Sequence, residues 1–237
     1  MDSNKTMDAK GLFEQILNAG RELTEQGQGY AQKKLDIPAE GPEREASLSG
    51  MGKGAAIAGV LALLLGTKAG RGITGAGLKL GTLAGLGGIA YKTYQDWQSR
   101  QTGQALPQAG TSVEGLTGTQ AEHRNLTLLK AMIAAAKADG HIDAKEGAKI
   151  EDLVSKLELD AATAKLIKTE LAKPLDPKDI AAAADSPAAA AEIYLTSLLV
   201  IDVDNKKERA YLDQLAEHLK IPKDLALQME AQAKQSA

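Results

Sequence analysis

The hydrophobic positions change character several times along the chain, and each change predicts a different kind of segment. Residues 8–35 place large apolar side chains at helical spacing between charged positions, which predicts a short amphipathic helix. The following stretch, 36–49, combines two prolines with acidic and small residues and predicts a linker. Residues 1–49 are therefore expected to form an amphipathic helix and a linker. The apolar positions of that helix are Leu12, Phe13, Ile16, Leu17 and Leu23.

Residues 50–97 are almost entirely small or apolar, which is typical of a membrane segment. The uninterrupted run 54–66 has 13 residues, and that corresponds to about 20 Å of helix against a hydrocarbon core of about 30 Å. It reaches spanning length if the basic residues after it extend to the headgroups, and the run 72–91 becomes similarly long if Lys79 is tolerated. One long span and two short spans both stay open. A buried glycine-rich hairpin in a soluble protein is a further alternative.

Small residues recur every four positions in this segment and give each run one smooth face. Helices in lipid associate through such faces because their backbones can approach closely, so the ladder predicts helix packing and a homo-oligomer. Aromatic residues follow the ladder at Tyr91, Tyr94 and Trp97, and such residues favour the membrane interface. The ladder consists of Gly50, Gly54, Ala58, Ala62, Gly66 and Gly70, followed by Gly77, Gly81 and Gly85.

The remaining chain has the pattern of a linker followed by a helical domain. Residues 98–120 are rich in Gly, Gln, Ser and Thr and predict a flexible linker. Residues 121–237 alternate helical runs with short breaks, and Pro187 and Pro222 each fall near an expected first helical turn. This pattern predicts a compact bundle of about seven helices. Their expected ranges are 122–138, 144–157, 161–172, 177–184, 187–201, 206–219 and 222–235.

An internal repeat at an offset of 62 residues relates the two halves of this bundle. Asp143 and Asn205 stand where a helix N-cap belongs, and Glu146 and Glu208 follow three residues later. This arrangement has the form of a capping box, so a structural role accounts for all four residues. The apolar positions that repeat are Ile150 with Leu212, Leu153 with Leu215, Leu157 with Leu219, and Leu159 with Ile221.

Composition supports an all-α fold and removes several classes of function. Aromatic residues make up only 3% of the 237 residues, which leaves little material for a sheet. The net charge of -3 comes from interspersed acids and bases, which argues against a nucleic-acid partner. The absence of cysteine excludes disulfides and thiolate sites but leaves the compartment open. The first residues lack the pattern of a cleavable export signal.

No catalytic pattern emerges from the reactive residues. The histidines are His123, His141 and His218, and none has a second histidine at metal-binding spacing, so all three are expected at the surface. A nucleophile elbow, a phosphate-binding loop and a zincin helix are missing, and the acidic runs fail the EF-hand spacing. The protein is therefore not expected to be an enzyme, and an unrecognised hydrolase is the weakest hypothesis.

Two separated motifs carry a family resemblance. The strings "AAAKADGHIDAKEGAKI" and "IYLTSLLVIDVDNKKERAYLDQLA" resemble the TerB-like helical domain first associated with tellurite resistance. The glycine-rich segment, the polar linker and "PLDP" between the two halves resemble the YebE-like inner-membrane protein family, over residues 50 to 230. The resemblance implies a compact bundle, association with the bacterial inner membrane and no established enzymatic activity. It also implies, more weakly, a link between acidic residues and metal ions or stress.

Two hypotheses about function follow. The preferred one is a membrane-anchored helical adaptor that binds an unknown protein partner in an envelope or metal stress response, with its C-terminal domain in the cytoplasm. The alternative is a divalent-cation-binding or metal-sensing module in which acids from both halves converge on Ca²⁺ or Mg²⁺. The candidate metal ligands are Asp139, Asp143, Glu146, Asp202, Asp204 and Glu208.

A solvated charge patch is the competing interpretation of the same acids. In that case neighbouring basic residues neutralise the carboxylates and no ion is required. The basic residues concerned are Lys137, Lys145, Lys206, Lys207 and Arg209.

Overall fold

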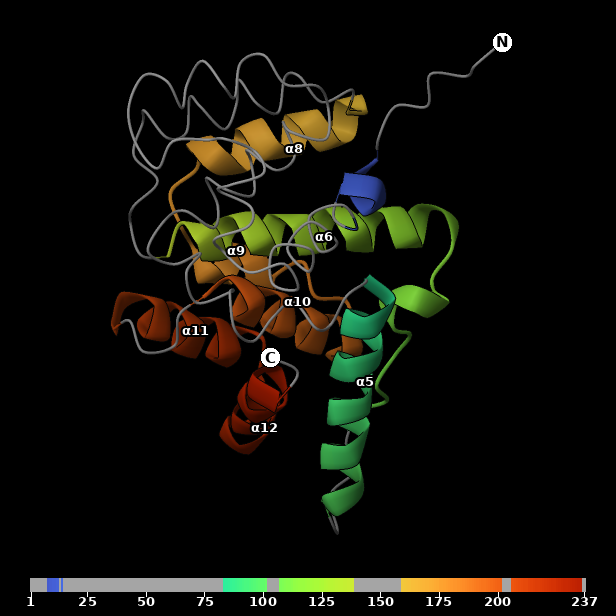
Figure 1. Cartoon of the computed structure of the whole chain (residues 1–237), viewed down its shortest axis with the longest axis vertical. Helices are drawn as coiled ribbons and strands as arrows, with labels where there is room; N and C mark the ends of the chain where they lie inside the picture. Colours follow the sequence, from blue (N-terminus) through green and yellow to red (C-terminus); the bar gives the residue numbers. More distant parts are fainter. Residues whose placement is uncertain are drawn as a thin grey trace, which may run out of the picture.

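A computed structural model describes residues 8–12, 14, 83–101, 107–138, 159–201 and 206–235. Every regular element in these ranges is a helix, which confirms the predicted all-α class (Figure 1). The elements are α5 (Leu83–Arg100), η3 (Val113–Gly115), α6 (Gly118–Ala136), α8 (Ala161–Ala172), α9 (Pro177–Ala181), α10 (Pro187–Val200), α11 (Lys206–His218) and α12 (Lys223–Gln235). Six of the seven ranges expected after residue 120 are matched to within a few residues, and the seventh, 144–157, lies outside the described residues.

Local capping explains where three of these helices begin. The Asp160 carboxylate accepts hydrogen bonds from the backbone amides of Ala162 and Thr163, both at 2.9 Å, and caps α8. Asp176 and Ser186 cap α9 and α10, and a proline follows each of them at the first helical position. A proline there gives up no hydrogen bond and has the φ angle that a helix needs. These starts could therefore be predicted from the sequence alone.

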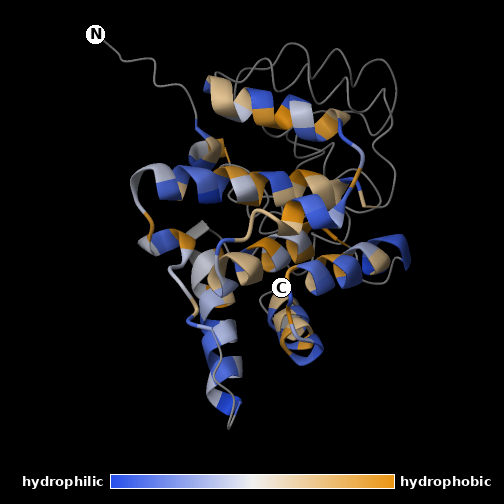
Figure 2. Ribbon diagram, turned by 180° about the vertical axis from the view of Figure 1, so that it is seen from behind, coloured by the Kyte–Doolittle hydropathy of each residue, from blue (hydrophilic) through white to orange (hydrophobic). Residues whose placement is uncertain are grey.

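Helix α10 is the centre of the bundle, and the other helices pack around it. All of its residues except Pro187 are buried, and it contacts α5, α6, α11 and α12. Its sequence is apolar on every face, which is the pattern of a helix surrounded by protein. Figure 2 shows the contrast with α11, which is largely hydrophilic and lies at the surface.

The structure extends the bundle into the predicted membrane segment. Residues 83–100 form α5, which packs against α10, and buries Leu86, Ala90, Tyr94 and Trp97. The expectation that Tyr94 and Trp97 lie at a membrane interface was therefore wrong, because both rings are covered by protein. Among the described residues, no helix combines the length and the apolar character that crossing a bilayer requires.

The predicted linker 98–120 is also partly built into the bundle. Val113 is buried in η3, and the Ala188 amide at the start of α10 donates to the Ala109 carbonyl at 2.7 Å. Gly110 has φ +81°, and a Cβ there would lie 2.6 Å from the Ser186 Cβ. The glycine that suggested flexibility instead permits a left-handed turn against α10. Composition alone does not distinguish a flexible linker from an ordered turn that packs against a helix.

The N-terminal segment and the repeat are described only in part. Residues 9–12 are helical, and Ala9 and Leu12 belong to the core, which fits the start of the expected amphipathic helix. In the second copy of the repeat, Leu212, Leu215 and Leu219 are buried as predicted. Of the first copy, only Leu159 is described; it is partly buried against the core, as is its counterpart Ile221. Of the glycine ladder, only Gly85 falls within a described element, α5.

A pair of leucine truncations tests the central position of α10. Leu195 is fully buried, whereas Leu227 on α12 is 53% exposed. Leu195→Ala should lower the free energy of unfolding by about 2–5 kcal/mol, because it removes buried methyl groups and leaves a cavity. Leu227→Ala makes the same chemical change and should stay within about 0.5 kcal/mol of the parent. Urea denaturation followed by circular dichroism measures both, and equal losses would contradict this arrangement of the core.

Candidate functional site

The predicted metal ligands are not tested by the described part of the molecule. Asp139, Asp143, Glu146, Asp202 and Asp204 lie outside the described residues. Glu208 is fully buried in α11. The described residues contain no group of three or more His, Asp or Glu side chains that could hold a metal ion.

Two of the basic residues that were expected to neutralise these acids have other partners. Lys137 donates through Nζ to the carbonyls of Glu170 at 2.7 Å and Lys173, at the C-terminus of α8. Burial lowers the pKa of the Lys137 ammonium, and Glu170 opposes that shift. Arg209 binds Asp213 and Glu230, each at 2.7 Å. Lys137 thus serves as a cap for α8, since a cation stabilises the C-terminus of a helix.

The histidines fit the surface positions predicted for them. His123 is exposed on α6, and His218 is exposed at the end of α11. His141 lies outside the described residues. His218 also lines a pocket, and within the described part of the chain that pocket is the strongest candidate for a functional site.

The pocket has a volume of about 510 Å³ and lies where α5, the α9–α10 connection and the α11–α12 turn meet. A volume of this size and a mostly apolar lining are typical of ligand sites. Its rim includes the exposed residues Asp185, His218 and Lys220, so the pocket opens at the surface. The apolar lining includes Tyr94, Trp97, Ala181, Ala184, Ala190, Ala191, Leu219, Ile221 and Leu225.

Two aromatic side chains from α5 form one wall of the pocket. The ring centroids of Tyr94 and Trp97 are 5.8 Å apart. Tyr94 donates its hydroxyl to the Pro107 carbonyl at 3.2 Å, and Trp97 donates Nε1–H to Asp224 Oδ2 at 2.6 Å. Because their polar groups are already bound to protein, the two rings offer apolar surface to the pocket.

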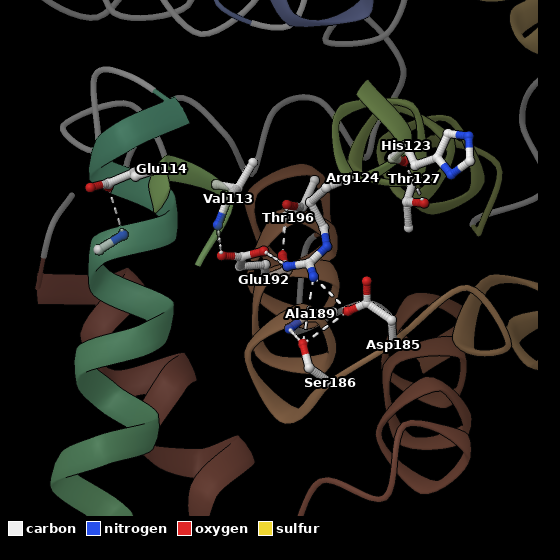
Figure 3. A network of polar contacts seen from close by, with 11 residues as sticks. Val113, Glu114, His123, Arg124, Thr127, Asp185, Ser186, Ala189, Glu192 and Thr196 are labelled. Atoms are coloured by element: carbon white, nitrogen blue, oxygen red, sulfur yellow. Dashed lines mark hydrogen bonds and ion pairs between the residues drawn. The ribbon is translucent and has the colours of Figure 1, made fainter. Parts of the chain in front are cut away.

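Asp185 and Ser186 are polar residues of the lining, and both belong to a network of polar contacts (Figure 3). Arg124, buried on α6, binds Asp185 Oδ1 at 2.5 Å through one guanidinium nitrogen. The Ser186 hydroxyl donates to the same oxygen at 2.9 Å and accepts from the Ala189 amide at 3.2 Å. Asp185 is therefore held in place although 70% of its side chain is exposed.

A second carboxylate holds the other end of the Arg124 guanidinium. Glu192 Oε2 accepts from it at 2.6 Å, and Glu192 Oε1 accepts from the Val113 amide at 2.7 Å. Glu192 is fully buried in α10. Burial raises the pKa of this carboxyl, while the Val113 amide and Arg124 act in the opposite direction. These contacts join η3, α6 and α10 directly below the rim.

Helix α5 joins these contacts because its backbone lies close to η3 at Gly87 and Gly88. A Cβ at Gly87 would lie 2.7 Å from a methyl group of Val113. The Glu114 carboxylate of η3 accepts from the Gly88 amide of α5 at 3.0 Å. The small residue thus lets η3 lie against α5.

Comparison with known proteins places the chain in a family. The family model described as "Protein of unknown function (DUF533)" matches residues 50–233. The chain belongs to this family. The DUF533 family is related to TerB-like domains, which confirms the coarser part of the predicted resemblance.

One curated relative has a similar sequence. It is the "Uncharacterized protein in ampR 5'region" of Yersinia enterocolitica, which is 36% identical over 126 residues. The alignment covers 53% of this chain and 87% of the relative. No solved structure matches the chain significantly.

The described contacts of the pocket suit binding. The Ser186 hydroxyl is engaged by Asp185, by the Ala189 amide and, at 3.5 Å, by Arg124. These contacts cap a helix and fix a carboxylate, and they do not form the nucleophile–base pair that hydrolysis requires. The pocket therefore has one fixed acidic group beside a large apolar surface.

The sequence analysis missed the polar contacts among Arg124, Asp185 and Glu192, although two signals were present. Glu192 is the only charged residue within the apolar helix α10, and a lone charge in such a helix usually has a buried partner. "DSP" at residues 185–187 has the form of a capped helix start. Neither signal indicates that Arg124, 61 residues before Asp185, is the partner of both acids.

Removing the buried guanidinium tests the junction below the rim. Arg124→Met leaves Glu192 as a buried charge without its counterion and should cost about 3–5 kcal/mol of stability. The double variant Arg124→Met/Glu192→Gln should recover most of this loss, because the amide keeps an acceptor for Val113 without a charge. Arg209→Met is the control, since its guanidinium is 34% exposed and such pairs contribute about 1 kcal/mol or less. Urea denaturation of the parent and these three variants gives the values, and no recovery in the double variant would contradict this account.

The raised pKa of Glu192 predicts the sign of one pH effect. The folded protein holds the proton of this carboxyl to higher pH than the unfolded chain, so its contribution to stability is largest in acid and falls as the pH rises through the folded pKa. The stability of the parent relative to Glu192→Gln should therefore decrease as the pH rises from the ordinary pKa of a glutamate toward the raised pKa in the folded protein. Urea denaturation across that range measures the difference, and an increase with pH would show that the pKa is lowered instead.

Proposed function

We propose that this protein is a membrane-tethered helical adaptor whose pocket receives an apolar side chain of a protein partner. The pocket carries the proposal, because a cavity of about 510 Å³ with aromatic and aliphatic walls suits a side-chain anchor. Its rim is drawn from three parts of the chain that pack on the central helix α10. Such a site is preorganised, so binding would order few side chains.

The proposed tether is narrower than the segment predicted from sequence. Residues 83–97 belong to the bundle through α5, which leaves the glycine-rich stretch 50–82 as the membrane segment. Its apolar composition and the resemblance to the YebE-like inner-membrane family support this assignment. In this proposal the helical domain faces the cytoplasm, and the ladder mediates self-association. Envelope or metal stress stays a prediction that rests on the resemblance alone.

Site-specific photocrosslinking tests the pocket as a docking site. A photoreactive amino acid replaces Ala182, an exposed residue of the pocket rim, in the full chain expressed in its native host. A discrete adduct with a protein is expected. Ala184→Phe should reduce that adduct at least about tenfold, because the larger side chain fills part of the space that an anchor needs.

Ala183→Phe is the matched control for this experiment. Ala183 is adjacent and exposed but does not line the pocket, so the same substitution there should leave the adduct unchanged. Equal adducts in both variants, or none in the parent, would reject the pocket as a docking site.

Fractionation of lysed cells tests the tether separately. The full chain should sediment with membranes, and deletion of residues 50–82 should release it, because that stretch holds the apolar surface assigned to lipid. Circular dichroism of the released protein should show a folded helical domain. A deletion variant that stays with membranes would reject this tether and leave the docking site to the crosslinking experiment.

A further inference from the structure

We infer that the pocket selects an apolar protein segment that carries a lysine or arginine beside its anchoring side chain. This inference rests on the proposed adaptor function and adds the chemistry of the partner. It is drawn from the one fixed and exposed carboxylate of the pocket lining, together with the aromatic residues of the same lining.

The Asp185 carboxylate can accept further hydrogen bonds. Both Arg124 and the Ser186 hydroxyl bind the same oxygen, Oδ1. Within the described part of the chain, Oδ2 accepts no hydrogen bond. The side chain is 70% exposed, whereas the Arg124 side chain beneath it is only 3% exposed. An incoming cation can therefore reach Asp185 from the pocket opening without displacing Arg124.

Arg124 neutralises the charge of Asp185 only in part. Its guanidinium is shared with Glu192, which lies at 2.6 Å and is fully buried. Two carboxylates thus face one cation, and the accessible one is at the rim. A ligand cation would complete the pairing, and it would meet a carboxylate whose position is already fixed, so less side-chain entropy is lost.

An apolar surface adjoins Asp185 in the pocket lining. Ala184, Ala190 and Ala191 are small residues of the pocket lining, and Tyr94 and Trp97 contribute its aromatic surface. Lysine and arginine have apolar stems, and their charged groups interact favourably with aromatic faces. An apolar side chain and a neighbouring basic one therefore match the two kinds of surface.

The rim also carries basic residues, which would repel an incoming cation if they stayed beside Asp185. Lys220 lies in the α11–α12 turn with φ +57° and is exposed, and His218 is exposed next to it. A lysine ammonium on a flexible four-carbon stem can turn into solvent when a cation binds. Asp185 cannot turn away, because two hydrogen bonds hold it. The fixed charge therefore determines the preference.

The test uses Trp97 as its reporter, because it is the single tryptophan of the chain and lines the pocket. Three capped peptides are titrated into the purified full-length protein, namely acetyl-Leu-X-Leu-amide with X as lysine, norleucine or glutamate. The fluorescence of Trp97 should saturate at roughly two- to fivefold lower concentration with lysine than with norleucine, which is the range for one exposed ion pair. The glutamate peptide should bind most weakly.

Two carboxylate variants separate the rim acid from a general effect of charge. Asp185→Asn keeps an acceptor for Arg124 and Ser186 and should make the lysine and norleucine peptides bind equally. Glu122→Gln removes an exposed carboxylate of α6 that does not line the pocket, and it should leave the preference unchanged. Thermal melting should show that both variants are folded. If Asp185→Asn unfolds the protein, Asp185→Glu serves instead and should alter the preference without abolishing binding.

The outcomes distinguish this inference from the function on which it rests. If the lysine and norleucine peptides bind the parent equally and Ala184→Phe prevents the binding of both, the proposed selectivity is wrong but the pocket is still a docking site. A lysine preference that survives Asp185→Asn would also overturn it. Absence of any saturable response in the parent would overturn both.

Discussion

The buried pairing of Arg124 with Glu192 is the interaction on which the rest of the described structure depends. It crosses from α6 to the central helix α10 and brings η3 with it through the Val113 amide. Burying a guanidinium and a carboxylate is costly, and the cost is offset only when both groups are fully hydrogen-bonded. Here Glu192 has two partners and Arg124 has a second carboxylate in Asp185. The pairing therefore specifies which helices meet and in which register.

The pocket follows from the same constraint. The buried guanidinium of Arg124 binds the exposed carboxylate of Asp185, so a buried cation fixes the acid at the rim. The capping of α10 by Ser186 adds a second bond to that acid. Trp97, which also lines the pocket, is fixed by Asp224 at the start of α12. These two parts of the lining are thus attached to different helices around α10, and neither can move without breaking a buried or partly buried polar contact.

Helix α5 connects the two halves of the proposed function. It begins at Leu83, directly after the proposed tether, and ends beyond Trp97 in the wall of the pocket. In that arrangement the pocket would lie within one helix length, about 27 Å, of the membrane segment. A partner bound there would be close to the bilayer. This placement suits an adaptor that acts on membrane-associated proteins.

The sequence by itself determined the helical class, six of the seven helix ranges in the C-terminal domain and three of the helix starts. These features depend on neighbours in the chain, because periodicity, proline and capping residues act within a few positions. It also predicted that Leu212 and Leu215 are buried, since their spacing marks one helix face. The candidate metal ligands stay a prediction of the sequence, because all but Glu208 lie outside the described residues.

Only the tertiary structure decided the pocket and the limits of the domain. Arg124 is 61 residues before Asp185 and 68 before Glu192, and no local pattern pairs it with either acid. Tyr94 and Trp97 have the composition of a membrane-interface cluster, and their burial depends on α10 and α12 lying beside them. An apolar surface can be covered by lipid or by protein at similar free energy. Which of the two covers it depends on what the rest of the chain brings to that place.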